Sequence, residues 1–325
     1  MAVVGGAPST GDPAVVAIVA RSLSCPAQPP VLVCTGTAIG ARVVLTAAHC
    51  VRDLDAAGLD VSSGTGLDGP YTRVLSARVH PDYVAGDASA DLAVLVLDAP
   101  LASIAPTGSL ALAAGATVRV VGFGATAGDA TSAGVKHAGA SEIAVVTAGL
   151  VGTVPGPALT CHGDSGGPVL APGAGGEELV AVTSTGDPGC VLDSQAVRID
   201  AHQSWLPAAI DVPPAPARPA YDAAVDLCTQ PCASDDECPA GLACRGTCTL
   251  AGLPAGRLGE ACAGDADGPC VAAPDGCRSF TACDDLDGSG CSAGGSAGWA
   301  ALAVLPFLAA IARRFRRPQA RGRAP

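Results

Sequence analysis

Short aliphatic segments recur between residues 14 and 184, and each is bounded by Gly, Pro, Asp or Ser. Such segments predict an antiparallel β protein with turns, and not a series of βαβ units. Apolar residues make up 49% of the chain but aromatic residues only 3%, so aliphatic side chains must fill the core. The segments are residues 14–20, 41–48, 92–97, 117–123, 143–147 and 179–184.

Two blocks far apart in the chain, Leu45–Cys50 and Gly163–Pro168, carry residues suited to nucleophilic chemistry. A serine hydroxyl is a poor nucleophile near neutral pH, so Ser165 needs an adjacent base, for which His49 is the natural candidate. A buried carboxylate should then fix the imidazole tautomer, and Asp91 fits because it opens an apolar run. The glycines around Ser165 let backbone N–H groups converge on a developing oxyanion.

Six motifs in their expected order resemble those of the trypsin/chymotrypsin-like serine endopeptidases, over about residues 3–210. A lone Gly-x-Ser-x-Gly would be a weak signal, but two six-residue blocks with an ordered acid are specific. The alternative is a catalytically silent, protease-like surface adhesion or binding protein, which the retention of all three triad positions disfavours. The motifs are Val3–Gly6, Cys34–Thr37, Leu45–Cys50, Asp91–Ala93, Gly122–Gly124 and Gly163–Pro168.

The resemblance implies an all-β domain of two antiparallel six-stranded β-barrels, with the active site between them. A closing helix is expected at residues 199–210, where Trp205, Leu206 and Ile210 would share one face. The length of 325 residues leaves room for one or two further units after this domain.

The resemblance also implies the reaction. Ser165 would attack the carbonyl of a protein or peptide substrate, His49 would transfer the proton, and Asp91 would orient His49. The N–H groups of Gly163 and Ser165 would bind the oxyanion. No metal ion and no organic cofactor is implied.

The residue six positions before the nucleophile, which is an acid at the base of the pocket in trypsins, is Leu159 here. A cationic P1 side chain would therefore lose its hydration without gaining a countercharge. An apolar or small P1 residue is expected. The rest of the pocket is expected from Ser184, Thr185, Gly186 and Ser194.

The resemblance carries an expectation about activation as well. In the family, a freed amino group at the position of Val3 pairs with the acid that precedes the nucleophile, here Asp164. Met1 and Ala2 precede Val3 and would block that ion pair. Because no secretory signal precedes Val3, the start of the exported chain is expected to lie upstream.

Fifteen cysteines indicate an oxidising compartment with structural disulfides. The resemblance implies that Cys34 pairs with Cys50 and Cys161 with Cys190. Cys25 has no family partner, so it is either free or joined to the C-terminal cysteines. Zinc binding is disfavoured because no Cys-x₂-Cys pair occurs.

Beyond residue 210 the composition changes. Residues 211–225 are rich in proline and predict a stiff linker. Residues 226–290 form a cysteine-rich module with little apolar sequence, so disulfides must supply its order. Its pattern fits a protease-resistant stalk or a small binding module, and calcium binding has little support because no EF-hand spacing is present.

Residues 291–317 predict a sorting or transmembrane segment with an arginine cluster, followed by a tail at 318–325. From Gly294 to Ala312 no residue is charged, which is borderline for spanning a bilayer as a single hydrophobic helix. The segment resembles bacterial C-terminal sorting signals of the Cys-bearing myxobacterial type. That likeness implies a sorting protease in the membrane and a processing or lipid-attachment role for Cys291, with a permanent anchor as the alternative.

The charge distribution agrees with export. Residues 292–325 hold six arginines and no acid, so the remainder carries 12 basic against 30 acidic side chains, a net charge of −18. The strongly negative charge of residues 1–291 disfavours nucleic acid as a partner. A secreted or cell-surface monomer, transiently or permanently attached to the membrane of a bacterial envelope, is expected.

Overall fold

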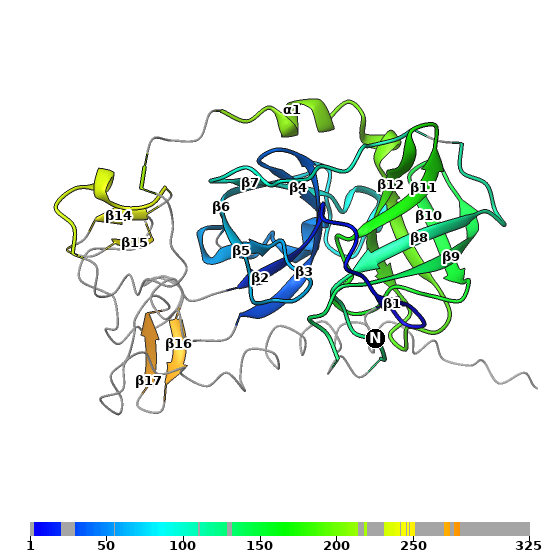
Figure 1. Ribbon diagram of the computed structural model, residues 1–325, viewed down its shortest axis with the longest axis horizontal. Helices are drawn as coiled ribbons and strands as arrows, with labels where there is room; N and C mark the ends of the chain where they lie inside the picture. The colour runs from blue at the N-terminus through cyan, green and yellow to red at the C-terminus, as the bar shows by residue number, and fades with distance from the viewer. Residues whose placement is uncertain are drawn as a thin grey trace, which may run out of the picture. The chain divides into compact units, whose positions relative to one another are not determined.

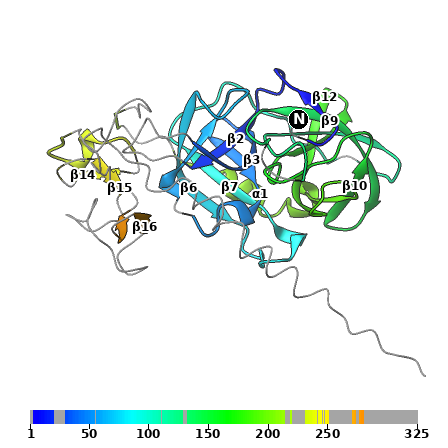
Figure 2. The same cartoon turned by 90° about the horizontal axis from the view of Figure 1, so that it is seen from below.

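The computed structural model divides the chain into two units, Met1–Ala251 and Gly252–Pro325. In the first unit two barrels lie side by side, as Figures 1 and 2 show from two directions. The structure describes residues 3–20, 30–54, 56–109, 111–128, 132–213, 218–219, 231–240, 242–244, 246, 248–250, 270–273 and 276–279.

The first barrel is closed in the order β2-β3-β4-β7-β6-β5, and every neighbouring pair is antiparallel. Its strands are β2 (Val15–Ala20), β3 (Val31–Gly40), β4 (Val43–Thr46), β5 (Leu59–Ser62), β6 (Tyr71–Val79) and β7 (Ala93–Leu97). Alternate residues of β2, such as Val16 and Ile18, belong to the core of this barrel. Their neighbours Val15 and Ala17 pack outside it, which explains why the strand is apolar on both faces.

The second barrel is closed in the order β8-β9-β10-β13-β12-β11, with β11 pairing back to β8. Its strands are β8 (Thr117–Gly122), β9 (His137–Val146), β10 (Leu150–Pro155), β11 (Pro168–Gly173), β12 (Gly176–Gly186) and β13 (Ser194–Arg198). A short strand near the N-terminus, β1 (Ala7–Pro8), adds to the outside of β9. The expected fold of two six-stranded antiparallel barrels is therefore confirmed.

An apolar layer, here called the seam, joins the two barrels. From the first barrel it includes Leu45 and Val94, and from the second Phe123 and Val182, all of them fully or almost fully buried. Strands that border the seam are covered on both sides, so their backbone hydrogen bonds are shielded from water. The loops at the ends of these strands meet at this junction.

The C-terminal segment of the domain differs from the single helix expected at 199–210. It consists of a 3-10 turn, η4 (Ile199–His202), and a short helix, α1 (Leu206–Ile210), which begins with Pro207 in its first turn. Trp205 and Leu206 pack against the seam, but Ile210 is exposed and Ala209 is the buried residue. The expectation of one continuous helix with Ile210 on its buried face was wrong, because a five-residue helix starting at Leu206 turns Ala209 inward instead.

The two ends of the domain pack on opposite barrels: the N-terminal segment lies on the second barrel and the C-terminal segment on the first. β1 and the preceding residues lie on the second barrel, where Arg119 forms an ion pair with Asp12. The segment around α1 returns over the first barrel, above β4 and β7 in Figure 1. There Arg78 of β6 donates to the carbonyls of Ala209 and Asp211, each at 2.9 Å.

The described residues of the cysteine-rich region include two small hairpins, one in each unit. In the first unit, β14 (Leu242–Cys244) pairs with β15 (Cys248–Leu250), after a 3-10 turn η5 (Asp235–Glu237). Disulfides Cys232–Cys244 and Cys238–Cys248 interlock this hairpin. In the second unit, β16 (Cys270–Ala273) pairs with β17 (Gly276–Ser279).

The expected sorting segment at 291–317, including Cys291, lies outside the described residues, and so does most of the linker at 211–225. Within the parts of the chain that the structure describes, no helix is long and apolar enough to cross a membrane. The 3-10 turns in the described residues of the first barrel are η1 (Ala48–Cys50), η2 (Ala56–Gly58) and η3 (Ala88–Ala90).

Candidate active site

His49 and Asp91 are brought together by neighbouring strands. β4 runs into the 3-10 turn η1 (Ala48–Cys50), which carries His49, and β7 begins just after Asp91. The pairing of β4 with β7 therefore places the two residues beside each other. His49 Nδ1 lies 2.7 Å from Asp91 Oδ2, and the backbone N–H of His49 donates to Asp91 Oδ1 at 2.8 Å.

Asp91 receives a third hydrogen bond from the second barrel. Ser184 Oγ, on β12, donates to Asp91 Oδ2 at 2.6 Å. The carboxyl group is almost completely buried, with 4% of its side chain exposed. Burial alone would raise the pKa of Asp91, but the hydrogen bonds from His49 and Ser184 outweigh burial and hold the pKa below its usual value. Asp91 is thus ionised at neutral pH.

Ser165 lies in the loop that leads into β11 and faces the same junction. Its Oγ donates to the carbonyl of Ser184 at 3.3 Å, and its own carbonyl accepts from Thr35 N at 2.9 Å. Among the described residues no hydrogen bond joins Ser165 Oγ to His49. Nucleophile and base often tighten their contact only when substrate is bound.

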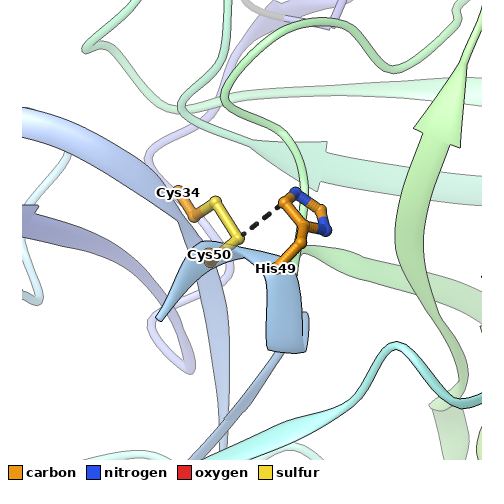
Figure 3. A group of neighbouring side chains, drawn as sticks. All are labelled: Cys34, His49 and Cys50. Atoms are coloured by element: carbon orange, nitrogen blue, oxygen red, sulfur yellow. Dashed lines mark hydrogen bonds between the residues drawn. A yellow bond between two sulfur atoms is a disulfide. The ribbon is translucent and has the colours of Figure 1, made fainter. Parts of the chain in front are cut away.

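A disulfide lies directly beside the imidazole of His49. Cys34 of β3 and Cys50 of η1 are bonded to each other, and Cys50 Sγ is 3.7 Å from His49 Nε2 (Figure 3). The same sulfur is 3.9 Å from the carbonyl of Ser165. The disulfide therefore fixes the turn that carries His49 to β3, and it lies beside the loop that carries Ser165.

The loop before β11 contains two glycines at positions that another residue would not fit. Gly163 has φ +93°, a conformation that favours glycine, and a Cβ at Gly166 would collide with the carbonyl of Thr35. The N–H groups of Gly163 and Ser165 donate to no described residue, so both can donate to a substrate oxygen.

Asp164 is completely buried next to the N-terminal segment. The N–H groups of Cys161 and Gly124 donate to its carboxylate at 2.8 Å, and Val3 N–H is a third donor. Burial raises the pKa of Asp164 to about 7, although these hydrogen bonds oppose the rise. Val3 is itself fully buried and has φ +54°, an unfavourable conformation for a β-branched residue.

The five expected pocket residues differ in exposure, and one of them, Ser184, contacts Ser165 through its carbonyl. Leu159 is buried, and its N–H donates to the carbonyl of Val4 at 2.9 Å. Ser184 and Ser194 are buried as well, whereas Thr185 and Gly186 are exposed at the end of β12. None of the five expected pocket residues carries a charge.

Three residues have contacts that the sequence alone did not indicate. Thr35 Oγ1 donates to the carbonyl of Gly163 at 2.9 Å, so it supports the nucleophile loop from β3. Thr160 forms a buried hydroxyl–hydroxyl hydrogen bond with Ser194 at 2.6 Å. Ser184 was expected only as part of the pocket. Thr35 stands within a family motif, which was the one signal for its importance, while Thr160 and the Ser184–Asp91 bond required the tertiary structure.

Disulfides occupy the cysteines nearest to the site. Cys161 is disulfide-bonded to Cys190, and Cys34 is disulfide-bonded to Cys50. Three groups of Cys and His in the described residues have their side-chain atoms close enough to bind a metal ion, but every cysteine in them is disulfide-bonded. Metal ions need the thiolate form, which a disulfide does not offer.

Two closed barrels with a histidine, a buried carboxylate and a serine-bearing glycine loop at their junction define a chymotrypsin-like serine endopeptidase. The Trypsin family model matches residues 3–206, which is more than half of the chain. The chain therefore belongs to the Trypsin family and is a serine endopeptidase that acts on proteins or peptides. Disulfide-bonded domains of this family are typical of secreted proteins.

Curated relatives agree with this assignment at modest identity. A protein named Trypsin from Saccharopolyspora erythraea is 29% identical over 183 residues, covering 48% of this chain and 76% of the relative. Trypsin alpha from Drosophila melanogaster is 28% identical over 176 residues, covering 47% of this chain and 67% of the relative.

Proposed function

We propose that this protein is an exported serine endopeptidase that works through Ser165, His49 and Asp91. The observation that carries the proposal is the arrangement of Asp91, an ionised buried carboxylate that binds both the N–H and the Nδ1–H of His49. This contact leaves His49 Nε2 as the basic nitrogen, which is the tautomer that can take a proton from Ser165.

The reaction then follows from the site. Ser165 Oγ forms a bond to the substrate carbonyl carbon while its proton passes to His49, and Asp91 stabilises the resulting imidazolium. The N–H groups of Gly163 and Ser165 bind the oxyanion. His49 donates its proton to the leaving amine, and water, activated in the same way, hydrolyses the acyl-enzyme.

The triad is tested by single substitutions. Ser165→Ala should lower kcat for peptide hydrolysis by several orders of magnitude, and Asp91→Asn by about 10⁴-fold, because the amide favours the wrong imidazole tautomer. Asp53→Asn makes the same chemical change on a side chain that is 73% exposed and serves as the control. Near-normal turnover by Asp91→Asn would show that another acid orients His49.

We further propose a preference for apolar or small P1 residues. Leu159 offers no charge to a P1 side chain, and the nearby hydroxyls of Thr160 and Ser194 satisfy each other. Two acids flank the pocket residues in sequence. Asp187, after Gly186, accepts hydrogen bonds from the N–H groups of its own loop, including those of Val191 and Leu192, and Asp193, before Ser194, is exposed. An arginine or lysine at P1 would be desolvated without a partner.

A library of peptide substrates tests this preference. Substrates with Ala, Val, Leu or Phe at P1 should have a higher kcat/KM than those with Arg or Lys. Leu159→Asp should raise kcat/KM for Arg substrates modestly, since only one wall of the pocket changes. A library profile of the unaltered protein dominated by P1 Arg would refute the preference.

Activation is proposed to require a free amino group at Val3. The N–H of Val3 already lies at the Asp164 carboxylate while the chain continues backward to Ala2. Hydrolysis of the Ala2–Val3 bond would replace this N–H by an ammonium group, which Asp164 could pair with, and would remove the φ constraint on Val3. Asp164 precedes Ser165 directly, so its ionisation state bears on the geometry of the nucleophile loop.

The pH dependence of folding stability tests this step. With the Ala2–Val3 bond intact, the raised pKa of Asp164 makes the folded state bind a proton more tightly than the unfolded state. Its contribution should therefore lower the free energy of unfolding as pH rises from about 4 to about 7, by up to about 4 kcal/mol. A chain beginning at Val3 should lose this decline and gain hydrolytic activity.

Urea unfolding across this pH range, combined with a peptide assay, provides the measurement. Asp164→Asn in the longer chain is the matched control, because it removes the titration and should give a flatter profile. Equal activity of the two chain lengths would contradict the proposed role of Val3.

For the C-terminus, we propose that the segment from about Gly294 directs the protein to the membrane and is then removed near Cys291. Gly294, Gly295, Ser296 and Gly298 weaken helix formation at one end of the apolar run, where a membrane protease could unwind it. The arginines hold the other end in the cytoplasm.

Mass spectrometry of the surface-extracted protein tests the removal. The mature form should lack peptides from the arginine-rich terminus, and Cys291→Ser should block processing without reducing hydrolysis by the protease domain. Recovery of that terminus from the mature protein would establish a permanent anchor instead.

A further inference from the structure

Two histidines outside the triad meet at the junction between β6 and the C-terminal segment. His80 follows the end of β6 and is 5% exposed, and His202 ends η4. Their rings stand edge to face, with centroids 4.6 Å apart and an interplanar angle of 80°. The ring of Trp205 also packs against His80, at 4.7 Å between centroids.

The hydrogen bonds of this pair define where each proton lies. The N–H of Asp82 donates to His80 Nδ1 at 3.2 Å, so the proton of a neutral His80 is on Nε2. His80 Nε2 is 3.1 Å from His202 Nδ1, which must then accept. The proton of His202 is consequently on Nε2, and it is donated to the carbonyl of Ser89 at 3.0 Å. The chain of bonds is complete only when both rings are neutral.

This chain ends on the turn that positions Asp91. Ser89 is in η3, and the N–H of Asp91 donates to Ala88 O at the end of that turn. On the other side of Asp91, the carbonyl of Leu92 accepts from the backbone N–H of His80 at 2.9 Å. His80 therefore holds the chain after Asp91 directly, and holds the chain before it through His202.

We propose that His80 and His202 are positioning residues for Asp91, and that a proton on either ring loosens the carboxylate that orients His49. The inference rests on the proposed role of Asp91 in hydrolysis. A proton on His202 Nδ1 would set two N–H donors against each other, and one on His80 Nδ1 would oppose the N–H of Asp82. The first proton breaks the His80–His202 hydrogen bond and the second breaks the Asp82–His80 hydrogen bond, so either one interrupts the chain that links Asp82 to Ser89.

Burial and the groups around His80 favour its neutral form. Burial lowers the pKa of His80, the proximity of His202 lowers it further, and the exposed Asp82 opposes the change. From η3, Asp87 faces the turn, but its carboxylate accepts from the N–H of Ser89. Tyr83 follows His80 in the chain, and its N–H donates to the His80 carbonyl.

The cations on the packed elements have other partners. Arg78 of β6 donates to backbone carbonyls at the end of α1, and Arg198 pairs with Asp200 at the start of η4. Protonation of the pair therefore gains no strong countercharge, and the chain should be intact at neutral pH and broken in acid.

Turnover of two His202 variants tests the positioning role. His202→Phe keeps a ring but removes the donor to Ser89, so kcat at pH 8 should fall about ten-fold, with KM changed less than about two-fold, because a small displacement of Asp91 misaligns His49. His202→Gln keeps a donor that does not titrate, and its kcat at pH 8 should stay close to that of the unaltered protein. His137→Asn, which replaces a buried histidine on β9 that is not part of this chain, is the control.

The pH profile separates positioning from a merely structural role. In the unaltered protein the acid limb of kcat/KM should be steeper than a single ionisation allows, because protons on His49 and on the pair both reduce the rate. In His202→Gln the limb should be less steep. An unchanged kcat in His202→Phe, or the same acid limb in His202→Gln and the unaltered protein, would overturn the inference.

Imidazole ¹H–¹⁵N NMR provides a measurement that does not depend on hydrolysis. At pH 8 both His80 and His202 should be in the Nε2–H tautomer, and both should keep it in Ser165→Ala. Either ring in the Nδ1–H tautomer would overturn the inference, whatever the activity. Absence of Ser165-dependent hydrolysis with both tautomers as expected would instead refute the proposed function.

Discussion

The burial of Asp91 is the constraint on which the active site depends. A carboxylate removed from water needs donors to remain ionised, and no single element of this fold supplies them. The η1 turn gives two through His49, and β12 of the second barrel gives the third through Ser184. The site can thus form only when the two barrels have closed against each other along the seam.

Asp164, in the loop before β11 of the second barrel, presents the opposite case. Its carboxylate is more deeply buried than that of Asp91, but its donors are backbone N–H groups without charge. The pKa of Asp91 is therefore lowered and that of Asp164 is raised, although both carboxylates are buried. Asp91 can therefore keep its charge near neutral pH, whereas the charge of Asp164 would depend on whether the amino group of Val3 is free.

The strand patterns predicted an antiparallel β protein because they are local signals, whereas the two barrels and the residues between them were predicted from the resemblance to the trypsin-like family. The segments at 92–97 and 117–123 correspond closely to β7 and β8. β9 begins at His137, well before the predicted segment at 143–147, because its first residues are a mixture of small and polar side chains without alternation. β3, β5, β6, β10, β11 and β13 coincide with none of the predicted segments, and several of them, such as β5 and β13, mix polar with apolar residues.

The contacts that sequence could not supply are those between distant elements. Ser184 was assigned to the pocket from its position, but its hydroxyl bonds Asp91, 93 residues away. His80 and His202 belong to no motif, and only the packing of η4 on the first barrel brings their rings together. Long-range pairing of this kind depends on how strands are ordered in space, which local patterns do not encode.

The attachment of the two terminal segments to opposite barrels affects how cooperatively the domain unfolds. The N-terminal segment is fastened to the second barrel and the C-terminal segment to the first, through β1 and α1 respectively. Melting of either barrel would release the segment that secures the other, so neither barrel should persist as a folding intermediate. The two halves are therefore expected to unfold in one transition despite their separate cores. A cut in the connection between β7 and β8 would leave them bound to each other as a noncovalent pair.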